Sequence, residues 1–359
     1  MRVGAFVLAA QFPGQGQGEA LHRAVRTAEV AEETGLDSVW LAEHHFVPYG
    51  VCPSAVTLAA LMLGRTRRLR VGTAVSVLPN THPVALGEQA ALLHLTSEGR
   101  FSLGVGRGGP WVDLEVFGGG LDAYENRFQE DLDLLRRWLA EPRVGAGSGA
   151  GSPAAAQAAV QPDLRGPGGR YGFREVAVVP RPSEALDGDG KGPEVIVACT
   201  SPASVRLAAE RGLPMLLGMH CGDEDKAAMV DLWRRTARAA GRSPEADHVS
   251  AGVCQLADRT ADARETLMKS MPGWLKQGLD AHVTVDGRRR AMRDPVAYTE
   301  LLCDLHPVGT PELAADRLAA TSERTGITRF ALLTEGSGDL AATEENLRRL
   351  GTEVVPRLG

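Results

Sequence analysis

Residues 70–108 read RVGTAVSVLPNTHPVALGEQAALLHLTSEGRFSLGVGRG, and this stretch contains the pattern that decides the fold. An apolar run over 69–78 is followed by a helical stretch over 83–96 and then by a second apolar run over 100–105. Near-continuous apolar runs are typical of strands that are buried on both faces, as in a parallel sheet. The stretch therefore predicts a strand–helix–strand unit of an α/β protein.

The same unit recurs along the chain of 359 residues. Further strands are expected at 2–9, 37–42, 194–199, 213–218, 248–257 and 328–334, which brings the total to eight. Further helices are expected at 19–34, 54–66, 122–140, 203–212, 223–241, 260–271, 310–325 and 339–350. Eight units in which a helix follows a strand favour a closed (β/α)8 TIM barrel over an open doubly wound sheet. We therefore predict one barrel domain over residues 1–359.

Two segments interrupt this pattern and are predicted to be insertions at the C-terminal rim of the barrel. Residues 143–169 are rich in Gly, Ala, Ser and Pro, and we expect this segment to be disordered in part. The stretch YGFREVAVVPRP (171–182) after it resembles a small β excursion. Residues 272–298 fit no barrel element, and we expect them to form a lid.

Composition and charge exclude several classes of partner. Acidic residues outnumber basic ones by 45 to 39, a net charge of −6, which argues against nucleic acid or an anionic membrane. No apolar stretch approaches the roughly 20 residues needed to span a bilayer. The five cysteines show no CxxC spacing and suit reduced thiols, so a cytoplasmic enzyme is expected.

The strand over 37–42 runs directly into Glu43, His44 and His45, at the rim where barrel enzymes place their working residues. Adjacent residues on a strand point to opposite faces, so the two rings cannot do the same job. A strand-end histidine can serve as a general base or a hydrogen-bond donor, or one ring can simply be packed while the other faces solvent. A metal site would favour a His-x-His pattern, which is absent, so no metal is predicted.

The sequence GVGRGG (104–109) contains the glycine spacing of a dinucleotide-binding turn. Such a turn needs a helix that starts within it, and PWVDLEVFGGG offers only a few residues before three glycines. We therefore favour a Gly-rich barrel loop whose backbone passes close to a ligand or another loop. Arg107 is then either a surface charge or an anion contact.

The stretch TSPASVRLAAERGLP (200–214) has the signature of a helix start. Ser201 fits the N-cap, Pro202 fits the first helical position, and the hydroxyl of Ser204 can reach the same exposed N–H groups. Free N–H donors and the positive end of the helix dipole make such a start suitable for a phosphate, although the residues by themselves favour ordinary capping.

Arg127 lies in the first turn of the helix predicted over 122–140. The helix dipole favours acidic residues at that end, so a basic residue there calls for a reason. A bound anion would be one reason, and a surface ion pair with Glu130 or Asp131 would be another.

Taken together, these motifs resemble the bacterial luciferase-like family of flavin-dependent monooxygenases. The resemblance covers nearly the whole chain outside 143–169 and 272–298. Its pieces, in chain order, are SVWLAEHHF (38–46), the stretch over 70–108, ENRF (125–128), TSPASVRLAAERGLPMLL (200–217), VGTPELAADRL (308–318) and GITRFALLTEG (326–336). Their order and combination carry the resemblance more than any single piece.

The resemblance implies a (β/α)8 barrel with FMN at its C-terminal mouth. His44 matches the family's catalytic base, and His45 matches the neighbour of that base. Ala74 and Val75 match the place where members carry a non-prolyl cis peptide beneath the flavin ring. The flavin phosphate is implied to bind at Arg107, Arg127, Ser201 and Ser204. Luciferase has a cysteine where this chain has Gly106, so a thiol there has no part in the mechanism.

The implied reaction is a two-component monooxygenation. Reduced FMN, supplied by a separate flavin reductase, would react with O2 to give a C4a-(hydro)peroxyflavin that oxygenates a small organic substrate. Phe12, Phe46 and Trp111 are expected to form aromatic pocket walls that exclude water, and a homodimer is expected through the helices over 54–66 and 83–96. The alternatives are a deazaflavin-dependent oxidoreductase that transfers hydride, a non-catalytic flavin-binding subunit, and a metal-dependent barrel hydrolase.

Overall fold

The computed structural model describes residues 1–146, 171–184, 190–288 and 293–359. Eight parallel strands form a closed barrel, because neighbours pair in the order β3-β2-β1-β13-β10-β9-β8-β5 and β3 also pairs with β5. The predicted (β/α)8 barrel is confirmed. The strands are β1 (Arg2–Val7), β2 (Ser38–Leu41), β3 (Arg70–Thr73), β5 (Phe101–Gly106), β8 (Glu194–Cys199), β9 (Met215–Leu217), β10 (Val249–Val253) and β13 (Arg329–Leu333).

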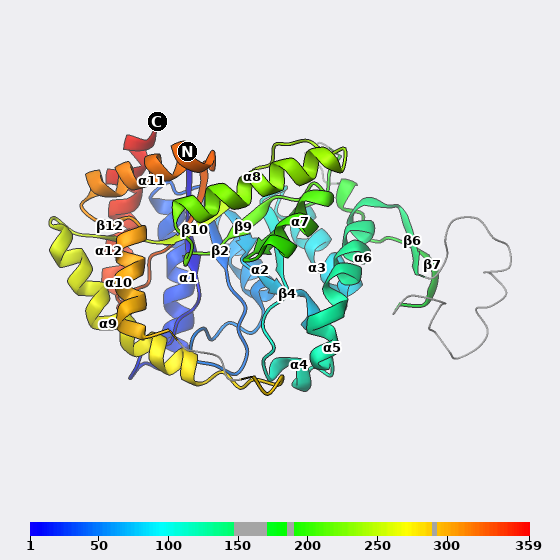
Figure 1. The fold of residues 1–359 in the computed structure, drawn as a ribbon, viewed down its shortest axis with the longest axis horizontal. Coiled ribbons are helices and arrows are strands. Elements are labelled where there is room, and N and C mark those ends of the chain that lie inside the picture. Colours follow the sequence, from blue (N-terminus) through cyan, green and yellow to red (C-terminus); the bar gives the residue numbers. More distant parts are fainter. Residues whose placement is uncertain (147–170, 185–189, 289–292) are drawn as a thin grey trace.

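Helices surround the strands (Figure 1), and the long ones other than α10 lie where the sequence predicted helices. The long ones are α1 (Gln17–Glu33), α2 (Ala55–Arg65), α3 (Pro83–Thr96), α6 (Phe128–Ala140), α7 (Pro202–Glu210), α8 (Asp223–Ala239), α9 (Thr260–Asp280), α10 (Pro295–Leu305), α11 (Pro311–Thr325) and α12 (Leu340–Arg349). No helix in the described part of the chain is both long and apolar enough to cross a bilayer.

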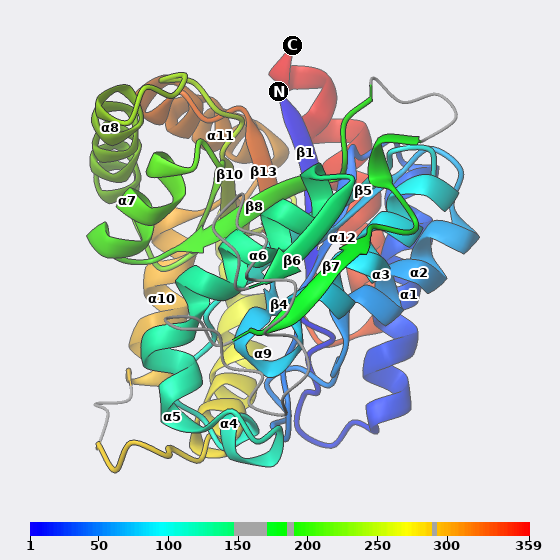
Figure 2. The same cartoon turned by 90° about the vertical axis from the view of Figure 1, so that its right-hand side faces the viewer.

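Short elements lie mainly in the loops. They are β4 (Ser76–Val77), α4 (Asp113–Val116), α5 (Gly120–Asp122), β11 (Gln255–Leu256), β12 (Val308–Gly309), the 3-10 helices η1 (Leu78–Asn80), η5 (Pro182–Glu184) and η7 (Val355–Leu358), and the π-helices η2 (Ala123–Arg127) and η6 (Leu350–Val354). The carboxyl ends of the strands point towards α4 and α5, whereas the chain termini lie at the opposite end of the molecule (Figures 1 and 2).

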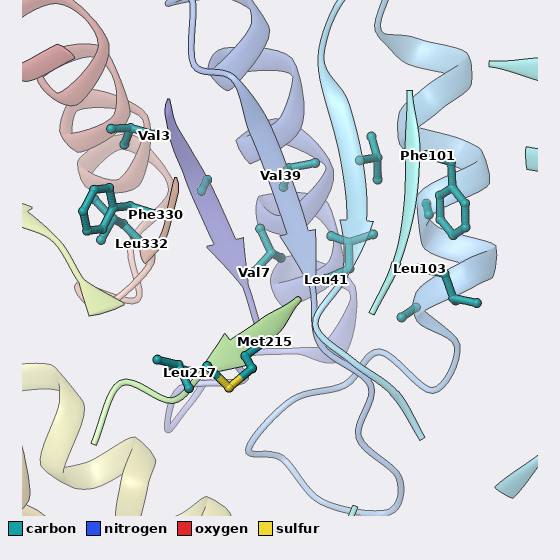
Figure 3. Close-up of a cluster of buried hydrophobic side chains, with 14 of the residues drawn as sticks. Val3, Val7, Val39, Leu41, Phe101, Leu103, Met215, Leu217, Phe330 and Leu332 are labelled. Carbon is teal, nitrogen blue, oxygen red and sulfur yellow. The ribbon is translucent and has the colours of Figure 1, made fainter. Parts of the chain in front are cut away.

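Alternate strand residues enter two different apolar clusters, which is why the strands read as continuous apolar runs. Val7 and Leu41 belong to the cluster that packs against the helices. Phe6 and Trp40, their neighbours in sequence, belong to the cluster that fills the barrel interior. Figure 3 shows side chains of the first cluster on β1, β2, β5, β9 and β13.

The two predicted interruptions differ in outcome. The β excursion is present, because β7 (Phe173–Ala177) pairs antiparallel with β6 (Arg143–Ala146) in a ribbon that projects away from the barrel in Figure 1. The remainder of the predicted insertion, 147–169, lies outside the described residues. The prediction that 272–298 fits no barrel element was wrong at both ends, since α9 continues through Pro272 to Asp280 and α10 begins at Pro295.

A buried ion pair joins the first and last strands at the rim. Glu335 follows β13, and its carboxylate accepts hydrogen bonds from the backbone N–H groups of Leu8 at 2.8 Å and Ala10 at 3.3 Å. Arg23 of α1 donates to the same carboxylate at 3.3 Å, and both side chains are almost fully buried. An unpaired charge at this depth would be strongly destabilising, so Arg23 and Glu335 must stay together. Their contacts hold the end of β1 against the segment that follows β13, where the first and last strands of the barrel meet.

Burial of His248 predicts how the free energy of unfolding depends on pH. Its Nδ1 accepts a hydrogen bond from Met215 N at 3.0 Å, and burial lowers the pKa of His248 to about 4. The unfolded chain regains a pKa of about 6.5, so it binds more protons than the folded protein between these values. Stability contributed by His248 is therefore lost as the pH falls from about 6.5 towards 4.

A variant can isolate this contribution. His248→Asn keeps an acceptor for Met215 but cannot titrate, so the slope of the unfolding free energy against pH should fall by up to about 1.4 kcal/mol per pH unit in this window. Urea unfolding at a series of pH values measures both slopes. Identical slopes for the two proteins would contradict the assignment.

Candidate active site

The turn after β2 carries His44 and His45, whose rings have different surroundings, as their adjacency predicts. The ring of His44 lies edge-on to Tyr49 with 5.1 Å between centroids. The ring of His45 lies edge-on to Phe117 with 4.9 Å between centroids. The two histidines therefore present different chemistry at the carboxyl end of one strand.

His44 is held as a neutral imidazole. Its backbone N–H donates to Cys52 O at 3.0 Å, and its Nδ1 is buried without a hydrogen-bond partner among the described residues. A Cβ atom at Gly50 would come within 2.7 Å of that Nδ1, so the glycine is needed for the ring to lie there. Burial, followed by the positive charges of His282 and His45, lowers the pKa of His44 to about 3. The imidazole of His44 is therefore neutral near pH 7.

Phe46 and Phe117 form an apolar edge beside His45. Phe46 has a φ of +62°, a rare conformation for an aromatic residue, and its side chain is 59% exposed. Its ring centroid lies 6.1 Å from that of Phe117, which is 47% exposed. The position of Phe46 suits the predicted pocket wall. Phe117 was missed because its sequence context, EVFGGG, carries no motif.

Trp111 anchors a strap that crosses the mouth. Residues 281–285, which follow α9, pair antiparallel with residues 110–112 through Val112 N to Val283 O at 2.9 Å and Val285 N to Pro110 O at 3.0 Å. Trp111 and Thr284 face each other in this pairing. The ring of Trp111 also packs on His282 with 4.7 Å between centroids. The strap therefore connects the loop after β5 to the end of α9.

The prediction that Phe12 is a pocket wall is not supported by its position. Phe12 is only 5% exposed and stacks on Trp274 with 5.4 Å between centroids. Trp274 in turn stacks on Tyr49 at 4.8 Å and donates its indole N–H to Tyr49 O at 3.1 Å. Phe12 therefore packs against Tyr49 only indirectly, through the ring of Trp274. The sequence analysis missed Tyr49, Trp274 and His282. Tyr49 could have been found, because it ends the stretch HFVPY (45–49) that begins at the second histidine.

The peptide bond between Ala74 and Val75 is cis, at the position that the family resemblance implies. It joins β3 to β4, next to the glycines that end β5. A Cβ atom at Gly106 would lie 2.4 Å from Cγ2 of Val75, and one at Gly108 would lie 2.8 Å from Cγ1 of Val77. The Gly-rich loop therefore passes close to another part of the chain, as predicted, and a cysteine in place of Gly106 would not fit beside Val75.

Arg107 and the start of α7 lie at one edge of the mouth. The register pairs Val105 of β5 with Val197 of β8, which brings the carboxyl ends of these strands together. The exposed Arg107 lies over the ring of Tyr124, 4.2 Å from guanidinium carbon to centroid, and donates to its hydroxyl at 3.2 Å. This guanidinium is free of carboxylate partners among the described residues and can reach an anion.

Arg127 has a different partner from those expected. Its Nε donates to Oδ2 of Asp122 at 2.7 Å, so the predicted pairing with Glu130 or Asp131 was wrong. The reason is the π-helical turn η2, which widens the helix and places Arg127 over the residue five positions earlier. Asp122 is 63% exposed, so this surface pair is weak and exchangeable.

Ser201 is the N-cap of α7, as predicted, and Pro202 is its first residue. The hydroxyl of Ser201 accepts from Ser204 N at 3.3 Å, and the hydroxyl of Ser204 accepts from the N–H groups of Thr200 and Ser201 at 3.2 Å. Ordinary capping is therefore present. It leaves both hydroxyls half-buried at a positive helix end, and α7 follows β8, the strand that pairs with β5 just before Arg107.

The largest-volume groove described lies away from the predicted site residues. A groove of about 970 Å³ lies between α8, α10 and α11, lined among others by His220, Asp223 and Arg324, and none of the predicted site residues lines it. Across the described ranges, no group of three or more His, Cys, Asp or Glu side chains is arranged to bind a metal ion.

The barrel and its rim residues define a class of protein, a (β/α)8-barrel enzyme with its site at the carboxyl ends of the strands. A family model described as luciferase-like monooxygenase matches residues 1–329. The chain belongs to the luciferase-like monooxygenase family and is thereby a flavin-dependent monooxygenase. One relative, the alkanal monooxygenase alpha chain of Photorhabdus luminescens, is 27% identical over 376 aligned residues, which cover 100% of this chain and 97% of the relative.

Solved structures share the fold. The monooxygenase RslO1 from Streptomyces bottropensis superposes with a TM-score of 0.78 at 23% identity, with 100% of both chains covered. The oxygenating constituent of 3,6-diketocamphane monooxygenase from Pseudomonas putida, in complex with FMN, gives 0.74 at 20% identity over 100% of this chain and 99% of that one. An F420-dependent secondary alcohol dehydrogenase gives 0.68 at 17% identity over 100% and 99%.

Proposed function

We propose that this protein is an FMN-dependent, two-component monooxygenase that oxygenates a small organic substrate with O2. The observation that carries the proposal is the neutral imidazole of His44 at the end of β2, at a mouth whose other edge carries Arg107 and the start of α7. When bound, reduced flavin supplies the activation of O2. The chain's own residues orient the reactants, exclude water and hold a proton at Nε2 of His44.

The residues present fit such a cofactor. The exposed guanidinium of Arg107 has no carboxylate partner among the described residues, so it is available to a phosphate. Arg107, Arg127 and the hydroxyls of Ser201 and Ser204 are cationic or polar groups of the kind that bind a phosphate. Ala74 and Val75 are apolar residues at the carboxyl end of β3 that belong to, or pack against, the cluster in the barrel interior. We assign His44 and His45 to the reaction, and Ala74, Val75, Arg107, Arg127, Ser201 and Ser204 to the flavin.

A separate reductase is part of the proposal. The glycine turn after β5 is followed by no helix until Asp113, and that helix ends at Val116, so it does not build a dinucleotide-binding turn. Reduced FMN then arrives from a partner enzyme. A homodimer is also proposed, through α2 and α3, because Leu61 and Leu92 on these helices are 45% and 54% exposed.

The second candidate function is hydride transfer with a deazaflavin cofactor. The F420-dependent alcohol dehydrogenase, whose cofactor F420 is a deazaflavin, has the same barrel fold. A non-catalytic flavin-binding subunit is disfavoured by the two histidines at the mouth. The cofactor that binds more tightly decides between FMN and the deazaflavin.

Titration of the purified protein with FMN, reduced FMN, riboflavin and the deazaflavin F420 tests the proposal. Arg107→Ala and Arg127→Ala should each weaken FMN binding by about 10- to 100-fold, since a hydrogen bond to a charged group contributes about 1.5–3 kcal/mol. Neither variant should change riboflavin binding, because riboflavin lacks the phosphate. Arg143→Ala is the control, since Arg143 pairs with Glu175 on the projecting ribbon.

If the arginine variants lost the same affinity for riboflavin as for FMN, the proposed phosphate site would be wrong. If the wild-type protein bound F420 more tightly than FMN, the deazaflavin-dependent function would be favoured. With NAD(P)H and FMN but no partner, the protein should not oxidise NAD(P)H at catalytic rates. Catalytic oxidation under those conditions would remove the separate reductase from the proposal.

A further inference from the structure

Three hydrogen-bond donors converge on the carboxylate of Glu43, the residue that precedes the two histidines. Its Oε1 lies 3.1 Å from Val77 N and 3.3 Å from Nε2 of His45. Its Oε2 lies 3.4 Å from Ala55 N. The side chain is only 11% exposed. Nothing in the proposed reaction uses this carboxylate, so its convergent contacts require another explanation.

Each donor belongs to a different segment of the mouth. Val77 ends β4, two residues beyond the cis peptide at Ala74–Val75. Ala55 is the first residue of α2, where the N–H group has no partner within the helix and the dipole favours a negative charge. His45 is the third. One carboxylate therefore connects the β3–β4 crossing, the start of a helix and an imidazole.

The contact with His45 also decides where its ring carries a proton. An ionised carboxylate only accepts hydrogen bonds, so Nε2 of His45 must be the donor. In the neutral ring, Nδ1 is then left as an acceptor. The edge contact with Phe117 at 4.9 Å limits rotation of the ring on its other side.

We propose that Glu43 is the positioning residue of the mouth, which keeps the proton of His45 on Nε2 and joins that histidine to the segment following Ala74–Val75. The part that His45 plays in turnover rests on the proposed function. The positioning itself does not, because every contact lies within the cofactor-free chain.

Glutamine cannot reproduce this arrangement. With its carbonyl oxygen in place of Oε1, its NH2 group would face the N–H of Ala55. With the amide turned round, its NH2 group would face the N–H of Val77, and His45 could stay bonded only by accepting on Nε2. Either orientation sets a donor against a backbone N–H, and the second moves the proton of His45 to Nδ1.

Glu32 provides a matched control. It also accepts backbone hydrogen bonds, from Arg67 N at 2.7 Å and Leu69 N at 3.3 Å, just before β3 begins and thus at the opposite end of the barrel. Glu32→Gln therefore removes another carboxylate that accepts backbone hydrogen bonds, but leaves the mouth unchanged.

Ring nitrogen shifts of His45 test the proposal in the histidine-labelled, cofactor-free protein, with assignment by loss of the signal in His45→Asn. The wild-type ring should be protonated on Nε2. In Glu43→Gln a neutral amide replaces the charged acceptor, so the Nε2 signal of His45 should shift whichever way the amide lies, while Glu32→Gln should match the wild type. Glu43→Asp, which keeps the charge, should retain the Nε2 proton.

A wild-type ring with its only proton on Nδ1 would overturn the proposal even if Glu43→Gln did not fold. An unchanged His45 signal in Glu43→Gln, or an equal change in Glu32→Gln, would overturn it as well. Failure of FMN to bind would defeat the proposed function but would leave these shifts unaffected, so the two failures are distinguishable.

Discussion

His44→Ala is expected to lower productive oxygenation by about 10²- to 10⁴-fold, the usual contribution of a positioned proton-transfer group. Hydrogen peroxide released per reduced flavin consumed should rise at the same time, because flavin still reacts with O2 but the substrate is no longer assisted. The affinity for FMN should change little, since the phosphate edge lies on other strands. The measurement uses a substrate found by screening oxygen uptake.

The pH dependence of kcat/KM in the wild-type protein provides a second test of the role of His44. Burial keeps the pKa of His44 at about 3, so the wild-type kcat/KM should show no limb from this group between pH 5 and 8. His44→Asn serves as the control for the cavity left by alanine, because it keeps a polar side chain at the end of β2 without a titrating ring. Unchanged coupling and turnover in both variants would rule out a role for His44.

The second large effect is expected from closing the strap covalently. Trp111 and Thr284 face each other between two backbone hydrogen bonds, the kind of antiparallel pair in which Cα atoms lie about 4.5 Å apart. This separation suits a disulfide. If residues 281–285 must move to admit the ligand, a disulfide at this pair should block that movement. In the double variant Trp111→Cys/Thr284→Cys, the oxidised form should therefore bind FMN at least about 100-fold more slowly than the reduced form of the same protein. Its turnover should be slower by a similar factor.

The comparison of the two redox forms of one protein removes the effect of losing the Trp111 ring. The five native cysteines are buried, so oxidation should be confined to the engineered pair. Each single variant should show no dependence on reductant. Equal rates in both redox forms would show that ligands enter the mouth without displacing this strap.

Much of the scaffold could be predicted from local patterns. Each of the eight apolar runs contains a barrel strand, and Ser201 and Pro202 open α7 as their residue types demand. The placement of His44 at the rim also follows from sequence, because it directly follows an apolar strand. These features depend on residues within a few positions of one another, where periodicity and capping preferences act directly.

The details of the candidate site needed tertiary structure. Pro272 lies within α9, although prolines usually mark helix boundaries, and Phe12 is buried behind Trp274. The π turn that pairs Arg127 with Asp122 breaks the spacing on which an α-helical prediction relies. In each case, packing or backbone geometry overrode a local preference.

The sequence by itself determined a (β/α)8 barrel of this family, with two histidines at the carboxyl end of the second strand. Only the tertiary structure decided that Trp111 meets Thr284, that Glu43 accepts from Val77 and Ala55, and that His44 lies over Gly50. The physical reason is that strand and helix patterns are local, whereas the loops that build the mouth acquire their partners only when the barrel closes and brings distant segments to one rim.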